Sequence, residues 1–78
     1  MIQEHDRVVL TERLADHGLE AGDVGTVVHV YSNGQAYEVE FVALDGHTAC
    51  VVTVEAANVR PVTRSDITHA RPMVGSDG

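Results

Sequence analysis

The sequence predicts a small all-β domain, and three observations indicate this class. Apolar residues make up 44% of the 78-residue chain, and valine, the commonest of them, has a branched Cβ that suits a pleated sheet. Valine-rich segments flank the dipeptides Asn33-Gly34 and Asp45-Gly46, which favour tight hairpin turns. The long segment without strand-like alternation, residues 12–23, is too short and too interrupted by glycine to form a stable helix.

Five segments carry the composition or the alternation of a β-strand. The clearest one places Tyr37, Val39 and Phe41 on one face and its two glutamates on the other, so the first set should face the core. Residues 55–58 are too few for an α-helix and suit a single 3₁₀ turn. The short last strand contains Pro61, which is tolerated only at the edge of a sheet. The expected strands span residues 6–11, 24–31, 36–42, 49–54 and 59–62.

The connections between these strands predict an SH3-like, partly open barrel. An ordered loop at 12–23 follows the first strand, tight turns lie at 32–35 and 44–48, and the 3₁₀ turn precedes the last strand. Closing the sheet on itself reduces the edges that would otherwise seed aggregation. A five-stranded OB barrel usually needs a helix between its third and fourth strands, and the chain leaves no room for one there. The barrel should span 1–62, and the aperiodic tail, 63–78, is expected to be flexible or to order only against something else.

Glycines that precede a strand can either bind a phosphate or allow the chain to turn. A phosphate-binding loop leads into a helix N-terminus and usually carries a lysine, whereas this chain has no lysine and its glycines lead into a strand. The glycines are therefore interpreted as structural. The expected turn residues are Gly22, Gly25, Asn33, Gly34, Asp45 and Gly46.

The charge balance limits the classes of partner. Twelve acidic residues against five arginines give a formal net charge of −7, and the whole imbalance falls within residues 1–62. Because Lys and Arg supply most non-specific affinity for nucleic acid, such a surface disfavours nucleic acid and anionic membranes as partners. It favours another protein, in particular a basic one. An exposed sheet edge or the tail could also pair two copies into a homodimer.

Three further features of the sequence predict a cytoplasmic protein. The chain has no apolar run of 18 residues, so no transmembrane helix is expected. Its first residues lack the basic and apolar blocks of a signal peptide. Cys50, the single cysteine, cannot form an internal disulfide and fits a reducing compartment.

Four segments, DRVVLTE, GLEAGDVGTVVHVY, YEVEF and VRPV, together resemble a small bacterial family catalogued as a domain of unknown function. The resemblance covers roughly residues 5–62 and implies a stand-alone SH3-like barrel of bacterial origin, with no assigned site residues to carry over. The segment GDVGTVVHVY is also similar to the start of the second strand in KOW-type barrels, which implies an RNA- or ribosome-binding alternative. A weaker likeness, in DRV and the glycine-to-valine step, is to the β-subunit barrel of nitrile hydratase and its accessory proteins. The arginine-rich stretch associated with that group is missing from 12–23.

No catalytic, cofactor-binding or metal-binding residues are expected. The five histidines are 12 to 22 residues apart along the chain, unlike the close pairs of zinc sites. Cys50 lies within a predicted strand, where burial and an acidic surface should raise its pKa rather than activate it. Glu38 and Glu40 share a strand face, but so small a barrel offers no evident cleft for a sugar.

The long loop, residues 12–23, is the strongest candidate for binding. Its four acidic residues against one arginine give a local net charge of −3, and the same loop of peptide-binding SH3 domains meets basic ligands. Few aromatic residues are available, which disfavours proline-rich peptides. We therefore expect a non-enzymatic protein-interaction module, an accessory or antitoxin-like partner of another protein, with the KOW-like and the metal-binding or nitrile-hydratase-accessory-like roles as alternatives. The candidate partner-binding residues are Glu12, Asp16, Glu20, Asp23 and Tyr31.

Overall fold

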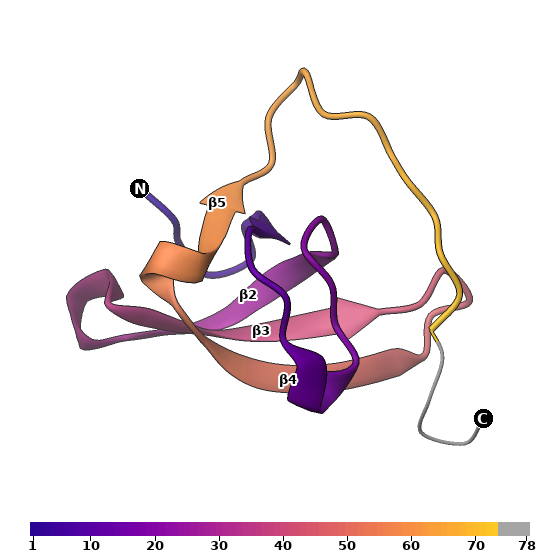
Figure 1. Cartoon of the computed structure of the whole chain (residues 1–78). Coiled ribbons are helices and arrows are strands. Elements are labelled where there is room, and N and C mark those ends of the chain that lie inside the picture. The colour runs from indigo at the N-terminus through magenta and orange to yellow at the C-terminus, as the bar shows by residue number, and fades with distance from the viewer. Residues whose placement is uncertain (74–78) are drawn as a thin grey trace.

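A computed structural model describes residues 1–73, so the final part of the predicted tail, 74–78, lies outside the described residues. Five antiparallel strands form one sheet in the order β4-β3-β2-β1-β5 (Figure 1). The only helical elements between residues 1 and 73 are three single 3₁₀ turns, η1 at Ala15–His17, η2 at Ser32–Gly34 and η3 at Ala56–Asn58. The strands are β1 (Arg7–Leu10), β2 (Val24–Tyr31), β3 (Ala36–Val42), β4 (Thr48–Glu55) and β5 (Val59–Pro61).

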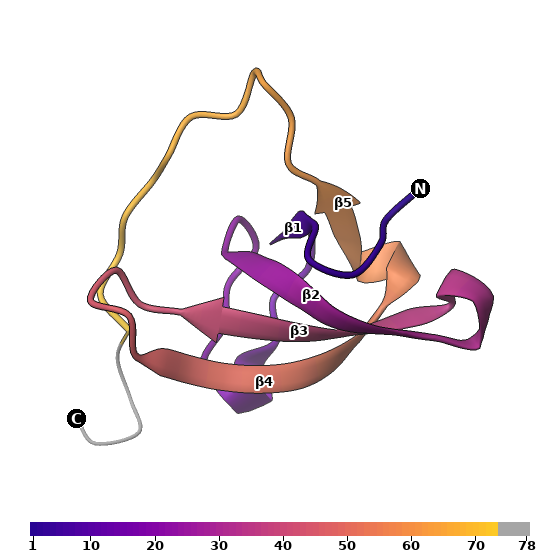
Figure 2. The same ribbon diagram turned by 180° about the vertical axis from the view of Figure 1, so that it is seen from behind.

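The sheet curves into the predicted SH3-like, partly open barrel. β1 pairs with β2 on one side and with β5 on the other, while β3 joins β2 to β4. Figures 1 and 2 show β5 and β1 lying across the concave side of the strongly bent β2–β3–β4 ribbon. The first and last strands are shorter than predicted and β4 is longer by one residue at each end. The expected 3₁₀ turn before the last strand is confirmed, as is the edge position of Pro61.

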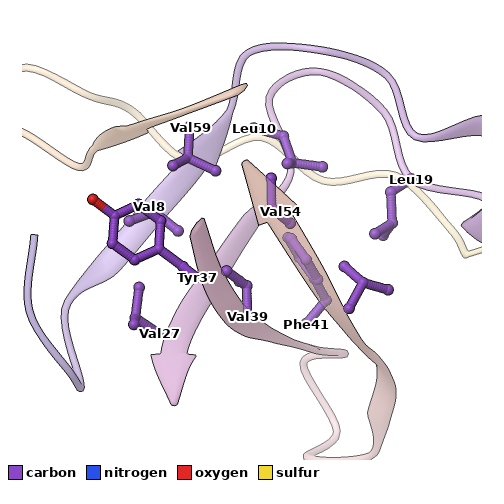
Figure 3. Packing of buried hydrophobic residues seen from close by; sticks show 10 residues of the cluster. Val8, Leu10, Leu19, Val27, Tyr37, Val39, Phe41, Val54 and Val59 are labelled. Atoms are coloured by element: carbon purple, nitrogen blue, oxygen red, sulfur yellow. The ribbon is translucent and has the colours of Figure 1, made fainter. Parts of the chain in front are cut away.

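The core lies between the bent ribbon and the strands that cross it. Tyr37, Val39 and Phe41 point inward from β3 as the alternation predicts, with exposed fractions of 6%, 0% and 3%. Side chains from all five strands meet them, and Leu19 of the long loop completes the cluster (Figure 3). The loop is thus anchored to the barrel by a core residue. The buried cluster consists of Val8, Leu10, Leu19, Val27, Tyr37, Val39, Phe41, Val52, Val54 and Val59.

The hairpin turns use positive φ angles where the sequence predicts them. Asn33 and Gly34 have φ of 61° and 87° within the β2–β3 turn. Gly46 has φ of 94° in the β3–β4 turn, and the Asp45 carboxylate accepts a hydrogen bond of 2.9 Å from the His47 backbone N–H. Ser32 also adopts a positive φ, 44°, which the sequence did not indicate.

Gly25 has a different role from the one expected. It lies inside β2, opposite Val8, rather than in a turn. A Cβ on Gly25 would lie 2.5 Å from the Cγ1 of Val39 and 2.9 Å from both the Glu40 carbonyl oxygen and Phe41 Cε1. Glycine is required there because the neighbouring strand β3 approaches too closely for any side chain. Gly22, with φ of 97° and open space around it, does serve the turn.

Residues 63–73 leave β5, arch away from the sheet and return toward the β3–β4 turn, as both views show (Figures 1 and 2). A bidentate pair fixes the start of this arch, because Arg60 Nη1 and Nη2 donate to the Asp66 carboxylate at 3.0 and 2.8 Å. The same carboxylate accepts a 2.7 Å hydrogen bond from the Thr63 backbone N–H. The chain is therefore redirected by a compact turn immediately after the barrel ends.

Candidate functional site

The long loop has a defined shape that its own backbone hydrogen bonds maintain. Leu14 and Leu19 form an isolated antiparallel bridge, with N–H···O distances of 2.9 and 3.1 Å. η1 fills the space between them, and Gly18, in the left-handed region at φ 71°, ends that turn. Leu19 is then only 2% exposed. The prediction of an ordered loop over 12–23 is confirmed by this arrangement.

The base of the loop is tied to β1 by two backbone hydrogen bonds. The Gly22 N–H donates to the Leu10 carbonyl at 2.7 Å, and the Leu10 N–H donates to the Asp23 carbonyl at 2.9 Å. The positive φ of Gly22 allows the chain to turn between these two contacts. Consequently the acidic residues of the loop are presented from a fixed backbone rather than from a flexible segment.

The four acidic residues of the loop differ in how they are paired. Glu12 and Asp16 are exposed, and within residues 1–73 neither side chain makes a hydrogen bond or an ion pair. Glu20 Oε2 lies 3.6 Å from Arg13 Nε in a solvent-exposed ion pair, and such a pair stabilises the loop only weakly. Asp23 is the exception, because its side chain is partly buried and forms an ion pair with Arg71.

Asp23 binds the guanidinium of Arg71, a residue of the C-terminal arch that lies 48 positions away in the sequence. The Arg71 Nε donates to Oδ1 at 3.0 Å and Nη2 donates to Oδ2 at 2.5 Å. The same Nη2 donates to the backbone carbonyl of Gly18 at 3.0 Å. Planar, two-point pairing of this kind is among the stronger hydrogen-bonded contacts of proteins. Nothing in the spacing of the sequence indicated Arg71 or the Gly18 carbonyl as site groups.

Hydrogen bonds keep the Asp23 carboxylate ionised. Burial by itself would raise the pKa of Asp23, but the hydrogen bonds from Arg71 and from the Glu20 backbone N–H, with the Arg71 charge, outweigh it and lower the pKa below its ordinary value. The Glu20 N–H lies 2.9 Å from Oδ2 and holds the carboxylate in place. The carboxylate is thus a fixed, charged acceptor at the base of the loop.

Tyr31 lies at the far end of β2 and does not touch the acids of the loop. Its hydroxyl donates to Glu38 Oε1 at 2.8 Å, and the Thr53 hydroxyl donates to the same oxygen at 3.0 Å. His29 packs edge-on against the Tyr31 ring at a centroid distance of 4.4 Å. Thr53 in turn borders a shallow depression of about 340 Å³ that residues 13–17 of the long loop also line. A polar row on the outer sheet face therefore connects Tyr31 with the loop tip, without bringing the two into contact.

The three arginines of the barrel do not gather beside Tyr31. Arg13 pairs with Glu20 in the loop, and Arg60 is clamped by the carboxylate of the arch. Arg7 lies opposite Thr26 on the neighbouring strand, five positions before Tyr31 and hence about 16 Å from it along the strand. The basic stripe with exposed aromatic residues that a nucleic-acid surface needs is not assembled by these side chains.

The histidines and the cysteine occupy separate places. Over residues 1–73 no three His, Cys, Asp or Glu side chains converge closely enough to hold a metal ion. His29 lies 3.9 Å from Glu4, and His47 lies 2.9 Å from Asp45, each at the surface. Cys50 packs against the core from β4, and burial, together with the charge of Asp23, raises the pKa of its thiol. That direction agrees with the sequence-based expectation.

The family model described as "Domain of unknown function (DUF4926)" matches residues 4–61. The chain belongs to this family. The match confirms the resemblance drawn from the four segments between residues 5 and 62, and DUF4926 coincides with the barrel, ending at the last residue of β5. No curated protein and no solved structure shows a significant match to the chain. Among the described residues, none lies in a helix that is long and apolar enough to cross a membrane.

Proposed function

We propose that this DUF4926 chain is a small acidic, non-enzymatic protein-interaction module whose long loop receives a basic segment of another protein. The observation that supports the proposal most is the Asp23–Arg71 contact. A guanidinium group already binds the loop there, through three hydrogen bonds of 2.5 to 3.0 Å. The loop can therefore recognise a basic side chain geometrically as well as by charge.

The fixed backbone of the loop also favours binding. A surface that is already in its bound shape loses little conformational entropy when a partner docks. Leu19 anchors the loop in the core, and the Leu14–Leu19 bridge holds the segment between them. Glu12 and Asp16 extend the acidic surface on this fixed segment, and with the net charge of −7 they would steer a basic partner toward it.

The alternatives draw less support from the geometry. A KOW-like RNA-binding role needs cations that are available to phosphates, whereas Arg13, Arg60 and Arg71 pair with carboxylates of the same chain. A metal-binding or nitrile-hydratase-accessory-like role would need a cluster of ligands, which residues 1–73 do not assemble. We further propose a cytoplasmic location, which the lone Cys50 favours.

Affinity capture with matched variants tests the proposal. The tagged chain is incubated with lysate of its source cells at low and at high salt, and captured proteins are identified by mass spectrometry. The loop variant is Glu12→Gln/Asp16→Asn. The control variant, Glu4→Gln/Glu55→Gln, removes the same number of negative charges from exposed positions outside the loop.

The proposal predicts a basic protein captured at low salt by the wild type and by the control variant, and lost both at high salt and with the loop variant. Equal capture by the two variants would show that net charge alone is responsible. Nuclease-sensitive nucleic acid in the eluate would instead favour the RNA-binding alternative.

A further inference from the structure

Hydrogen bonds from one side chain, that of Arg71, tie the returning part of the C-terminal arch to the long loop. In the described stretch 67–73, Arg71 makes the only side-chain hydrogen bonds to the loop. The other side chains of this stretch are exposed, and Ile67 is 90% exposed. No strand pairing involves these residues. Removing one contact would therefore release the stretch without disturbing the core.

The groups that receive Arg71 are fixed independently of it. The Asp23 carboxylate is held by the Glu20 backbone N–H at 2.9 Å. The Gly18 carbonyl is positioned by the left-handed φ of that residue and by its own N–H, which donates to Ala15 at 3.1 Å. The receiving site consequently exists whether or not Arg71 occupies it.

The acceptors match a guanidinium better than an ammonium group. The two carboxylate oxygens accept from different nitrogens of Arg71, Nε and Nη2, and the Gly18 carbonyl accepts a second hydrogen from Nη2. A lysine has one nitrogen and no planar fork, so it cannot reproduce this side-on pairing. The contact is also accessible to exchange, because the two side chains keep 26% and 19% of their surface exposed.

We propose that the Asp23 carboxylate and the Gly18 carbonyl form an arginine seat, which Arg71 closes from within the chain and which an arginine of a basic partner occupies by displacing Arg71. This inference rests on the proposed function. It adds to it the side chain that is recognised, an arginine, and an internal competitor, Arg71, that limits binding of the partner. When an internal ligand occupies the site, the apparent Kd of an external ligand equals its intrinsic Kd divided by the fraction of time that the site is open. If the open seat is a minor state populated at about 10%, the upper end of the usual range, opening it would tighten binding roughly tenfold.

A peptide titration of the full-length chain tests the arginine seat. The probes are two fluorescein-labelled peptides, one of four Gly-Arg repeats and one of four Gly-Lys repeats, and binding is followed by fluorescence anisotropy at low salt. The chain is compared with Arg71→Ala and with Arg64→Ala, which removes the same charge from an exposed position of the arch. Arg71→Ala/Asp23→Asn then tests the carboxylate, and circular dichroism verifies that each variant is folded.

The proposal predicts that Arg71→Ala binds the arginine peptide roughly tenfold more tightly than the wild type and Arg64→Ala do. The lysine peptide should gain much less, and adding Asp23→Asn should cancel the gain. An equal gain in Arg64→Ala, or an equal gain for the lysine peptide, would overturn the arginine seat. If Arg71→Ala binds like the wild type while Glu12→Gln/Asp16→Asn still weakens binding, only the seat fails. If neither peptide binds in a loop-dependent manner, the proposed function fails with it.

Discussion

Replacing Gly25 by alanine tests the close packing of β2 against β3. The new Cβ would lie 2.5 Å from Val39 Cγ1, and Val39 is completely buried. It would also lie 2.9 Å from the Glu40 carbonyl oxygen, which is backbone and cannot rotate away. Overpacking in a core costs about 1–3 kcal/mol. The contact with backbone points to the upper part of that range, and the lower entropy of the unfolded alanine chain offsets about 0.4–1 kcal/mol.

The net expectation is a loss of about 2 kcal/mol in the free energy of unfolding, which corresponds to a fall in Tm of roughly 8–16 °C for a domain of this size. Urea unfolding followed by circular dichroism measures the loss. Combining Gly25→Ala with Val39→Ala removes the 2.5 Å contact, so the double variant should lose less than the sum of the two single variants. A neutral Gly25→Ala, or strictly additive effects, would refute this account of how β2 and β3 pack.

Three further predictions concern ionisable groups. The hydrogen bonds from Arg60 and the Thr63 backbone hold the pKa of Asp66 well below its ordinary value of 3.8. The turn that these bonds form should therefore be fully stable above the pKa that Asp66 has in the unfolded chain, and should be lost as the pH falls through the lower pKa of the folded chain. An NMR titration midpoint of Asp66 at or above 3.8 would contradict this. Burial raises the pKa of the Cys50 thiol, so Cys50 should react with iodoacetamide more slowly at pH 8 than an unstructured cysteine peptide does. The hydrogen bond to Glu38 raises the pKa of Tyr31, so Glu38→Gln should lower the pH midpoint at which the NMR signals of the Tyr31 ring titrate. An unchanged midpoint would show that the hydrogen bond is not formed in solution.

Local patterns in the sequence were sufficient to predict the barrel. The alternation in 36–42 determines which side chains of β3 face the core, since a strand places successive residues on opposite faces. The Asn33-Gly34 pair tolerates the positive φ angles of its turn, so it too could be recognised from neighbouring residues alone. Each of these features depends on residues close together in the chain.

Features that depend on distant residues were not predictable in the same way. The role of Gly25 is set by Val39 and Phe41 of the neighbouring strand, and no local pattern distinguishes it from a turn glycine. The pairing of Arg71 with Asp23 joins a segment without periodicity to the base of the long loop. Opposite charge was the only available signal, and it does not select one carboxylate among twelve acidic residues.

The surface at which a basic partner docks can be mapped residue by residue in solution. The ¹⁵N-labelled full-length chain is titrated with the purified basic protein obtained by affinity capture, and the backbone amide shifts are followed by NMR. If the long loop receives the partner, the largest changes fall within residues 12–23, and the signal of Arg71 moves as its side chain is displaced. Changes centred instead on the outer sheet face around Tyr31, Glu38 and Thr53, with the loop unperturbed, would contradict the assignment of the long loop as the docking surface.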